Sequence, residues 1–261
     1  MNRRDKYLQL FKDRIHEIDL LRGFLIILVV FDHLMWFFLN YIFQYNHPFL
    51  LWYWTSDLRY IVRQFVIFLF MFLCGLSCHL SKNNKKRGAY LLIFSIIISI
   101  GSYILQLLPM FANRVVHLDI NILGVIAISI LAYSLVEKRS NRDVLYITAV
   151  LMIFYFFILI SSRTLPNTDF NHFLSILYCP YNPIKEGYVA DYLPLFPYII
   201  FLFLGVLFAR IIYKNKTSVI TKKGNWERPI CFLGRHTLLI YVAHEIIFTL
   251  VFMGISVLMK L

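Results

Sequence analysis

Long apolar runs alternate with short polar segments along this chain. Each run holds roughly 20 apolar residues, the length that a helix needs to cross the hydrocarbon core of a bilayer. The pattern predicts an all-α, polytopic transmembrane helical bundle of about seven spans. In chain order, the expected spans are 18–41, 60–80, 89–108, 119–136, 143–160, 193–213 and 229–258.

The composition excludes a soluble globular protein. Of the 261 residues, 60% are hydrophobic and 15% are charged, whereas an average soluble domain has roughly 45–50% and about 25%. A chain of this size cannot hide so many apolar runs in one soluble core. A lipid bilayer is therefore the expected partner of its surface.

The formal net charge of +12 does not indicate a nucleic-acid partner, because the basic residues form short clusters between apolar runs instead of one basic face. Such clusters precede the first run and follow the second, fourth and sixth. By the positive-inside rule, these segments are cytoplasmic. The amino terminus is then inside and, with seven spans, the carboxyl terminus outside.

This organisation predicts a basic cytoplasmic segment at 1–17 and a single transmembrane domain at 18–258. The first apolar run is longer than a typical signal-peptide core and lacks a small-residue cleavage site, so we expect it to remain as the first span. The long connection at 161–192 is expected outside. Loops of this length without periodicity are usually functional or disordered.

The cysteines and histidines match no familiar framework. Three cysteines fall in apolar runs and one in a loop, which favours packing over disulfide pairing; they are Cys74, Cys78, Cys231 and Cys179. No His-x-x-x-His or Glu-x-x-His spacing occurs on a predicted helix, so no metal site is expected.

The first span carries ionisable groups, which are costly in lipid and usually face a cavity or a partner. Arg22 lies near its inner end and Asp32-His33 in its outer half. Eleven residues are almost three helical turns, so Arg22 and His33 share one stripe about 16 Å long. This stripe suits an acyl-coenzyme A, with its anionic head inside and its reactive end reaching inward. Alternatively, Arg22 anchors the helix to lipid phosphate and His33 pairs with another group.

Asp32 lies about 100° round the helix from His33, so its partner is expected on a different helix. Arg63, in the second span, could neutralise Asp32 or hold an anionic acceptor. Arg59 lies one turn nearer the outer end. Both arginines are candidates for substrate binding.

The seventh span has Arg235 at its inner end and His244-Glu245 further out. Thr237, Tyr241 and His244 form one polar stripe. His244 and Glu245 are candidate substrate-binding residues, although a histidine that bonds a neighbouring helix explains His244 equally well.

Two further acidic residues near the outer face are substrate-binding candidates. Asp119 opens the fourth span and Asp191 precedes the sixth. A helix cap is an equally good explanation of Asp119.

Several segments together carry a resemblance. RIHEIDLLRGFLIILVVFDH at 14–33 resembles the opening of membrane-bound acyltransferases, in which ten residues separate an Arg and a His, here Arg22 and His33. Further blocks follow in order: FLFMFLCGLS at 68–77, a basic turn with Lys86-Arg87, DYLPLFPYIIFLFLGVLFAR at 191–210 and LGRHTLLIYVAHE at 233–245. The ordered set is similar to the heparan-α-glucosaminide N-acetyltransferase catalytic-domain family of bacteria, which is related to acyltransferase family 3.

The resemblance implies transfer of an acetyl or other acyl group from cytoplasmic acyl-coenzyme A to a hydroxyl or amine of an extracytoplasmic sugar or glycan. His33 would be the general base, with Asp32 beside it. The coenzyme would be held by Arg22, Lys86, Arg87 and Arg235. A bacterial cytoplasmic membrane is the expected location, and a homo-oligomer is left open.

Two features depart from the family pattern. Where the family has G-I-L-H-x-I, this chain reads NILGVI at 121–126, with Gly124 in the place of the His. In the heparan enzyme the catalytic His belongs to the first outer loop, where His47 is the candidate. The base is therefore His33, His47 or both in turn, and His33 is the expected one.

Two other functions fit some of the same residues. A proton-coupled transporter could use Asp32, His33, Arg63 and His244 as a relay, although the chain has no inverted repeat of the kind that many transporters contain. A membrane assembly subunit without catalysis would be favoured by Gly124.

Overall fold

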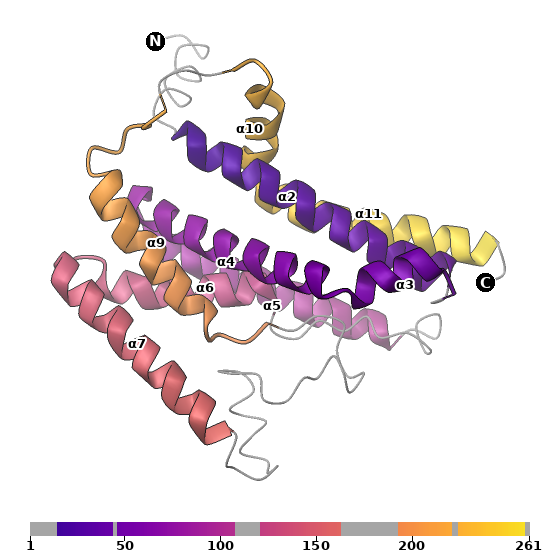
Figure 1. The fold of residues 1–261 in the computed structure, drawn as a ribbon, viewed down its shortest axis with the longest axis horizontal. Coiled ribbons are helices and arrows are strands. Elements are labelled where there is room, and N and C mark those ends of the chain that lie inside the picture. Colours follow the sequence, from indigo (N-terminus) through magenta and orange to yellow (C-terminus); the bar gives the residue numbers. More distant parts are fainter. Residues whose placement is uncertain (1–14, 44–45, 108–120, 163–192, 221–223, 259–261) are drawn as a thin grey trace. The chain divides into compact units, whose positions relative to one another are not determined.

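The computed structural model describes residues 15–43, 46–107, 121–162, 193–220 and 224–258, and this part of the chain is helical without strands (Figure 1). The all-α prediction is confirmed. The helices are α2 (His16–Phe37), the π-helical turn η1 (Phe38–Ile42), α3 (Pro48–Thr55), α4 (Asp57–Leu80), α5 (Asn84–Gln106), α6 (Ile122–Val136), α7 (Asn141–Ser162), α9 (Tyr198–Ile212), α10 (Glu227–Arg235) and α11 (Thr237–Leu258).

Five segments of the described chain are long and apolar enough to cross a membrane: His16–Ile42, Asp57–Leu80, Asn84–Gln106, Asn141–Ile160 and Thr237–Ile255. The helices α6 and α9 are apolar but shorter, at 15 residues each. These segments match the predicted spans in order. How many of them cross the membrane, and on which side each end lies, stay predictions.

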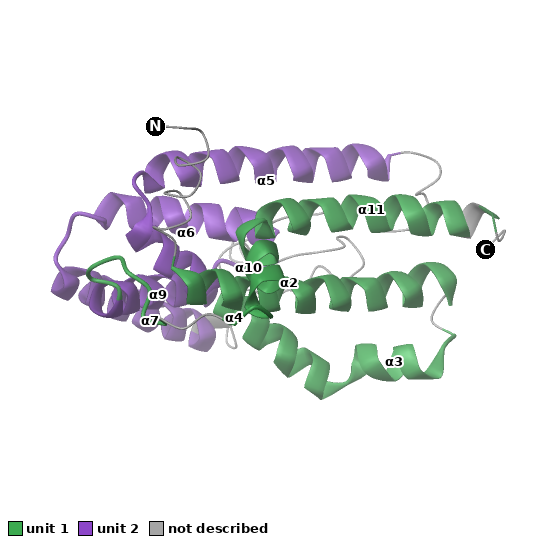
Figure 2. Ribbon diagram, turned by 90° about the horizontal axis from the view of Figure 1, so that it is seen from above, with its two compact units in different colours: residues 1–70, 213–261 green, residues 71–212 purple. Residues whose placement is uncertain are grey.

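Figure 2 shows two compact units, residues 1–70 with 213–261 and residues 71–212. The division falls within α4. The single-domain organisation of 18–258 stays a prediction. The segments predicted to be cytoplasmic, 1–17, and an outer loop, 161–192, lie almost wholly outside the described residues.

In unit 1, α11 runs beside α2 in the same direction, because the residues that meet rise in number together along both. Helix α10 instead crosses the start of α2, where Asp19 meets Gly234 and Gly23 meets Ile230. Asp19 meets Arg235, and further along Phe37 packs on Phe252 with ring centroids 5.5 Å apart. Two glycines bring the backbones close. A side chain at Gly234 would overlap the carbonyl oxygen of Asp19. A side chain at Gly23 would likewise overlap the carbonyl oxygen of Ile230 on α10.

The last predicted span, 229–258, is two helices instead of one. His236 leaves the helical conformation, with φ −104° and ψ 19°. The hydroxyl of Thr237 donates to the carbonyl of Gly234 over 2.7 Å, which satisfies a group that the break exposes. The break ends α10, which packs on the first half of α2, and α11 continues along the second half.

In unit 2, a reciprocal pair of glycines joins α4 and α9. A side chain at Gly75 would overlap the carbonyl of Leu202, and one at Gly205 would overlap that of Phe72. Small residues commonly allow such close packing between membrane helices. Helix α6 packs against both α5 and α9.

Polar side chains make hydrogen bonds to backbone groups at both ends of α6. Asn121 caps its start by accepting a hydrogen bond from the backbone N–H of Gly124 over 3.1 Å. At its other end the guanidinium of Arg210 donates to the carbonyls of Glu137 and Arg139 over 2.7 and 2.8 Å. Asp119, the cap suggested by the sequence, lies outside the described residues.

Cys74, Cys78 and Cys231 are buried in their helices. The expectation that they are packing residues is confirmed. Cys179 lies outside the described residues.

The glycine packing predicts that Gly205→Ala lowers stability by about 1–3 kcal/mol, because the added methyl overlaps backbone that cannot move aside. Gly101→Ala is the matched control, since no atom lies within 4 Å of its added methyl and alanine favours a helix. Thermal unfolding in detergent, followed by circular dichroism, compares the two. Equal midpoints for the two variants would contradict this packing.

Candidate active site

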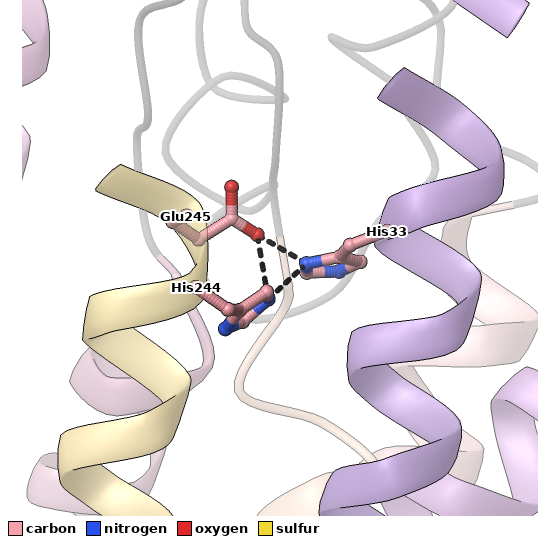
Figure 3. Close-up of side chains that lie close together, drawn as sticks. All are labelled: His33, His244 and Glu245. Atoms are coloured by element: carbon pink, nitrogen blue, oxygen red, sulfur yellow. Dashed lines mark hydrogen bonds and ion pairs between the residues drawn. The ribbon is translucent and has the colours of Figure 1, made fainter. Parts of the chain in front are cut away.

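His33 from α2 meets His244 and Glu245 from α11, and we name these three residues the His–His–Glu cluster (Figure 3). Nδ1 of His33 lies 2.9 Å from Nε2 of His244 and also pairs with the carboxylate of Glu245. The carboxylate lies 3.3 Å from Nε2 of His244. Three proton-binding atoms therefore surround one point.

The partners of His244 and Glu245 fix the tautomers within the cluster. Nδ1 of His244 lies 2.9 Å from the carbonyl oxygen of Ile240, and a carbonyl can only accept. Nδ1 therefore carries the proton of the neutral ring and Nε2 has a lone pair. The carboxylate of Glu245 also accepts only, so the shared proton belongs to Nδ1 of His33. The lone pair of neutral His33 is then on Nε2, as a general base requires.

The cluster is partly enclosed. His244 is 5% exposed, whereas the side chains of His33 and Glu245 are 33% and 38% exposed. The next turns carry packed aromatic rings, including Phe37 on α2 and Phe248 on α11, which meet edge to face. One side of the cluster is thus apolar, and the side chains of His33 and Glu245 are only partly enclosed.

Asp32, although next in sequence to this cluster, is directed toward α3 and α4. Its carboxylate accepts two hydrogen bonds from Arg59, at 2.7 and 2.8 Å, and a third from the hydroxyl of Tyr53 at 2.8 Å. The guanidinium of Arg59 lies 3.4 Å from the ring centroid of Trp54. The prediction that Asp32 pairs with another helix is confirmed, and its partner is Arg59 instead of Arg63.

Burial and the hydrogen bond to Asp32 raise the pKa of Tyr53 to about 12. Its hydroxyl therefore stays protonated at physiological pH and keeps donating to Asp32. Tyr53 thereby fixes the short helix α3 against α2.

His47 has a different setting from that of His33. It caps α3, where its Nδ1 accepts a hydrogen bond from the backbone N–H of Leu50 over 3.4 Å. The proton of the neutral ring is then on Nε2, the nitrogen that would have to accept a proton from a substrate. This capping position favours a structural role for His47.

The candidate coenzyme-binding residues fall in both units. Arg22 and Arg235 belong to unit 1, where Nε of Arg235 lies 3.3 Å from the carboxylate of Asp19. Lys86 and Arg87 begin α5 in unit 2. Arg63 lies one turn beyond Arg59 on α4. Asp119 and Asp191 lie outside the described residues.

A polar network that the sequence did not reveal surrounds the start of α2. His16 contacts the carboxylate of Glu227 over 2.5 Å. The carboxylate of Glu17 accepts hydrogen bonds from the hydroxyl of Ser218 and from the backbone N–H of Val219. Burial and the neighbouring Glu17 raise the pKa of Tyr213 to about 12. These contacts hold the connection after α9 against α2.

Residues 14–246 match the family model described as "Heparan-alpha-glucosaminide N-acetyltransferase, catalytic". The chain belongs to this family. The matched range begins just before α2 and ends just after Glu245, so it includes the whole His–His–Glu cluster. No curated protein and no solved structure matches the chain.

Family membership confirms the resemblance and makes the chain a member of a family of membrane acetyltransferases. The sequence identified His33, His244 and Glu245 singly, but not as a group, because 211 positions separate His33 from His244. The sequence feature that pointed to this site was an adjacent His-Glu pair inside an apolar run.

The contacts of Asp32 predict that Arg59→Lys destabilises this acetyltransferase-family protein by about 1–3 kcal/mol, because a lysine cannot reproduce the two-pronged pair. Arg142→Lys, at an exposed position, is the control. Thermal unfolding in detergent measures the difference. The account of Asp32 is wrong if both variants unfold at the wild-type temperature.

Proposed function

We propose that this protein transfers an acetyl group from cytoplasmic acetyl-coenzyme A to an amine or hydroxyl of an extracytoplasmic sugar or glycan, with His33 as the general base. The observation that carries the proposal is the contact of His33 Nδ1 with Glu245, which directs the basic lone pair to Nε2. Family membership supports acetyl transfer as the reaction class. A bacterial cytoplasmic membrane is the proposed location.

In the proposed reaction, Nε2 of His33 takes a proton from the acceptor amine or hydroxyl as the acceptor attacks the thioester carbonyl. The new C–N or C–O bond forms and the C–S bond breaks. The imidazolium then returns the proton to the departing sulfur. Imidazole suits this exchange because its pKa lies near neutrality.

Glu245 and His244 act as positioning residues in this scheme. The carboxylate of Glu245 accepts the Nδ1 proton of His33 and stabilises the imidazolium that forms. His244 is held by the carbonyl of Ile240 and limits rotation of the His33 ring. Asp32 does not face the base, because Arg59 and Tyr53 occupy its carboxylate.

The donor would lie along α2. Arg22 and Arg235, both in unit 1, are proposed to bind its phosphates at the inner end. Lys86 and Arg87 stay candidates for holding the coenzyme. The pantetheine arm would then follow the stripe of about 16 Å from Arg22 to His33. Arg63 stays a candidate for contacting the acceptor.

A direct test measures thiol release from acetyl-coenzyme A by the purified protein in nanodiscs, with methyl α-glucosaminide as the probe acceptor. His33→Gln is expected to lower kcat/KM by about 10²–10⁴-fold, the usual contribution of a general base. His47→Gln keeps the overall shape and is the matched histidine control. It is expected to lose far less activity.

Loss of activity in His47→Gln with retention in His33→Gln would reassign the base to the outer loop. Absence of thiol release and of acetyl-coenzyme A binding in the wild-type protein would overturn the proposed function. That result would favour the proton-coupled transporter.

The donor path predicts that Arg22→Ala raises KM for acetyl-coenzyme A by about tenfold and changes kcat less, because it removes one charged contact worth roughly 1.4 kcal/mol in ground state and transition state alike. Arg142→Ala, at an exposed position, controls for the loss of a positive charge. An unchanged KM in Arg22→Ala would show that Arg22 does not hold the donor.

A further inference from the structure

The His–His–Glu cluster has the ligands of a transition-metal site. It offers Nδ1 of His33, Nε2 of His244 and a carboxylate oxygen of Glu245, and these atoms all lie within 4.8 Å of one another. Two imidazoles and one carboxylate are the ligand set of open zinc sites, in which a fourth position stays available. We propose that these three residues bind one divalent transition-metal ion, with Zn²⁺ as the best match.

Two of the three donor-atom separations are close to those of a tetrahedral ion. With bonds of about 2.0–2.1 Å, two donors of a tetrahedral site lie roughly 3.4 Å apart. The separation is 2.9 Å between the two histidine nitrogens and 3.3 Å between Glu245 and His244. The contact between His33 and Glu245 is closer than this, so these two side chains must turn apart to admit an ion.

The setting of His244 supports metal binding independently of these distances. A metal-binding histidine almost always donates its second N–H to a carbonyl or carboxylate, which orients the ring and fixes its tautomer. Nδ1 of His244 makes such a bond to Ile240. Its Nε2 lone pair is thus directed to the centre of the cluster before any ion arrives.

The charge of the cluster also favours a cation. One shared proton lies among three atoms that can each accept it, namely two ring nitrogens and a carboxylate oxygen. A divalent ion can replace this proton and bind all three at once. The exposed sides of His33 and Glu245 leave space for a fourth ligand such as water.

Metal binding has a consequence for catalysis, and this step rests on the proposed function. A neutral His33 that binds the ion through Nδ1 must carry its proton on Nε2, so it loses the lone pair that a general base needs. The bound ion therefore inhibits acetyl transfer, and its removal by a chelator restores the activity.

Binding is tested without any activity measurement. Purified full-length protein in nanodiscs is dialysed against buffered Zn²⁺, and bound zinc is counted by elemental analysis and titrated by calorimetry. We expect one ion per chain. In a second experiment Co²⁺ replaces Zn²⁺, and intense visible absorption would report tetrahedral binding in the unaltered protein.

His244→Gln and Glu245→Gln are each expected to weaken binding by more than about 100-fold, because loss of an outer partner alone costs 10–100-fold. His236→Gln, which removes an exposed histidine next to α11, should bind as the wild type does. Circular dichroism checks that each variant is folded. Absence of stoichiometric zinc in the wild type, or equal affinity in all folded variants, overturns the metal site.

The two proposals fail separately. Zinc binding by a protein that never releases coenzyme A would keep the metal site and remove the acyltransferase function. Acetyl transfer by a protein that binds no zinc would keep the acyltransferase function and remove the metal site. Transfer that continues with zinc bound would overturn the inhibition alone.

Discussion

The register between α2 and the α10–α11 pair is the constraint on which the rest of unit 1 depends. Gly23 and Gly234 allow the two backbones to touch near one end, and Phe37 packs on Phe252 near the other. A shift of one residue would turn each side chain by about 100°. Such a shift would separate His33 from Glu245, so apolar packing decides whether the polar cluster forms.

The ionisable groups of α2 are tolerable in an apolar helix because each has a partner. An isolated carboxylate in lipid is costly, but Asp32 accepts three hydrogen bonds from Arg59 and Tyr53. Its neighbour His33 shares a proton with Glu245 on α11. Two adjacent residues therefore contact different helices. Asp32 holds α3 and α4 against α2, and His33 is left available for chemistry.

Hydropathy predicted the helical segments well, because a bilayer requires apolar runs of a set length. It missed the break at His236, because apolar residues lie on both sides of the break. The short helix α3 was also missed, although Pro48 at its start and His47 as its cap were local signals.

Partners across helices were harder to predict than the polar residues themselves. The sequence identified both Arg59 and Arg63, but only the positions of α3 and α4 show that Arg59 pairs with Asp32. Absence of a His-x-x-x-His spacing suggested no metal site, yet that rule applies to ligands on one helix. The His–His–Glu cluster draws on two helices, so no local spacing could reveal it.

Nuclear magnetic resonance of the ring nitrogens of His33 tests the central claim most directly. Protein labelled with ¹⁵N-histidine is measured in metal-free nanodiscs near neutral pH, and the signals of His33 are assigned by their loss in His33→Gln. The account predicts that the neutral form of the ring carries its proton on Nδ1 and has an unprotonated Nε2. A neutral ring protonated on Nε2 would contradict it, because His33 would then have no lone pair directed at a substrate.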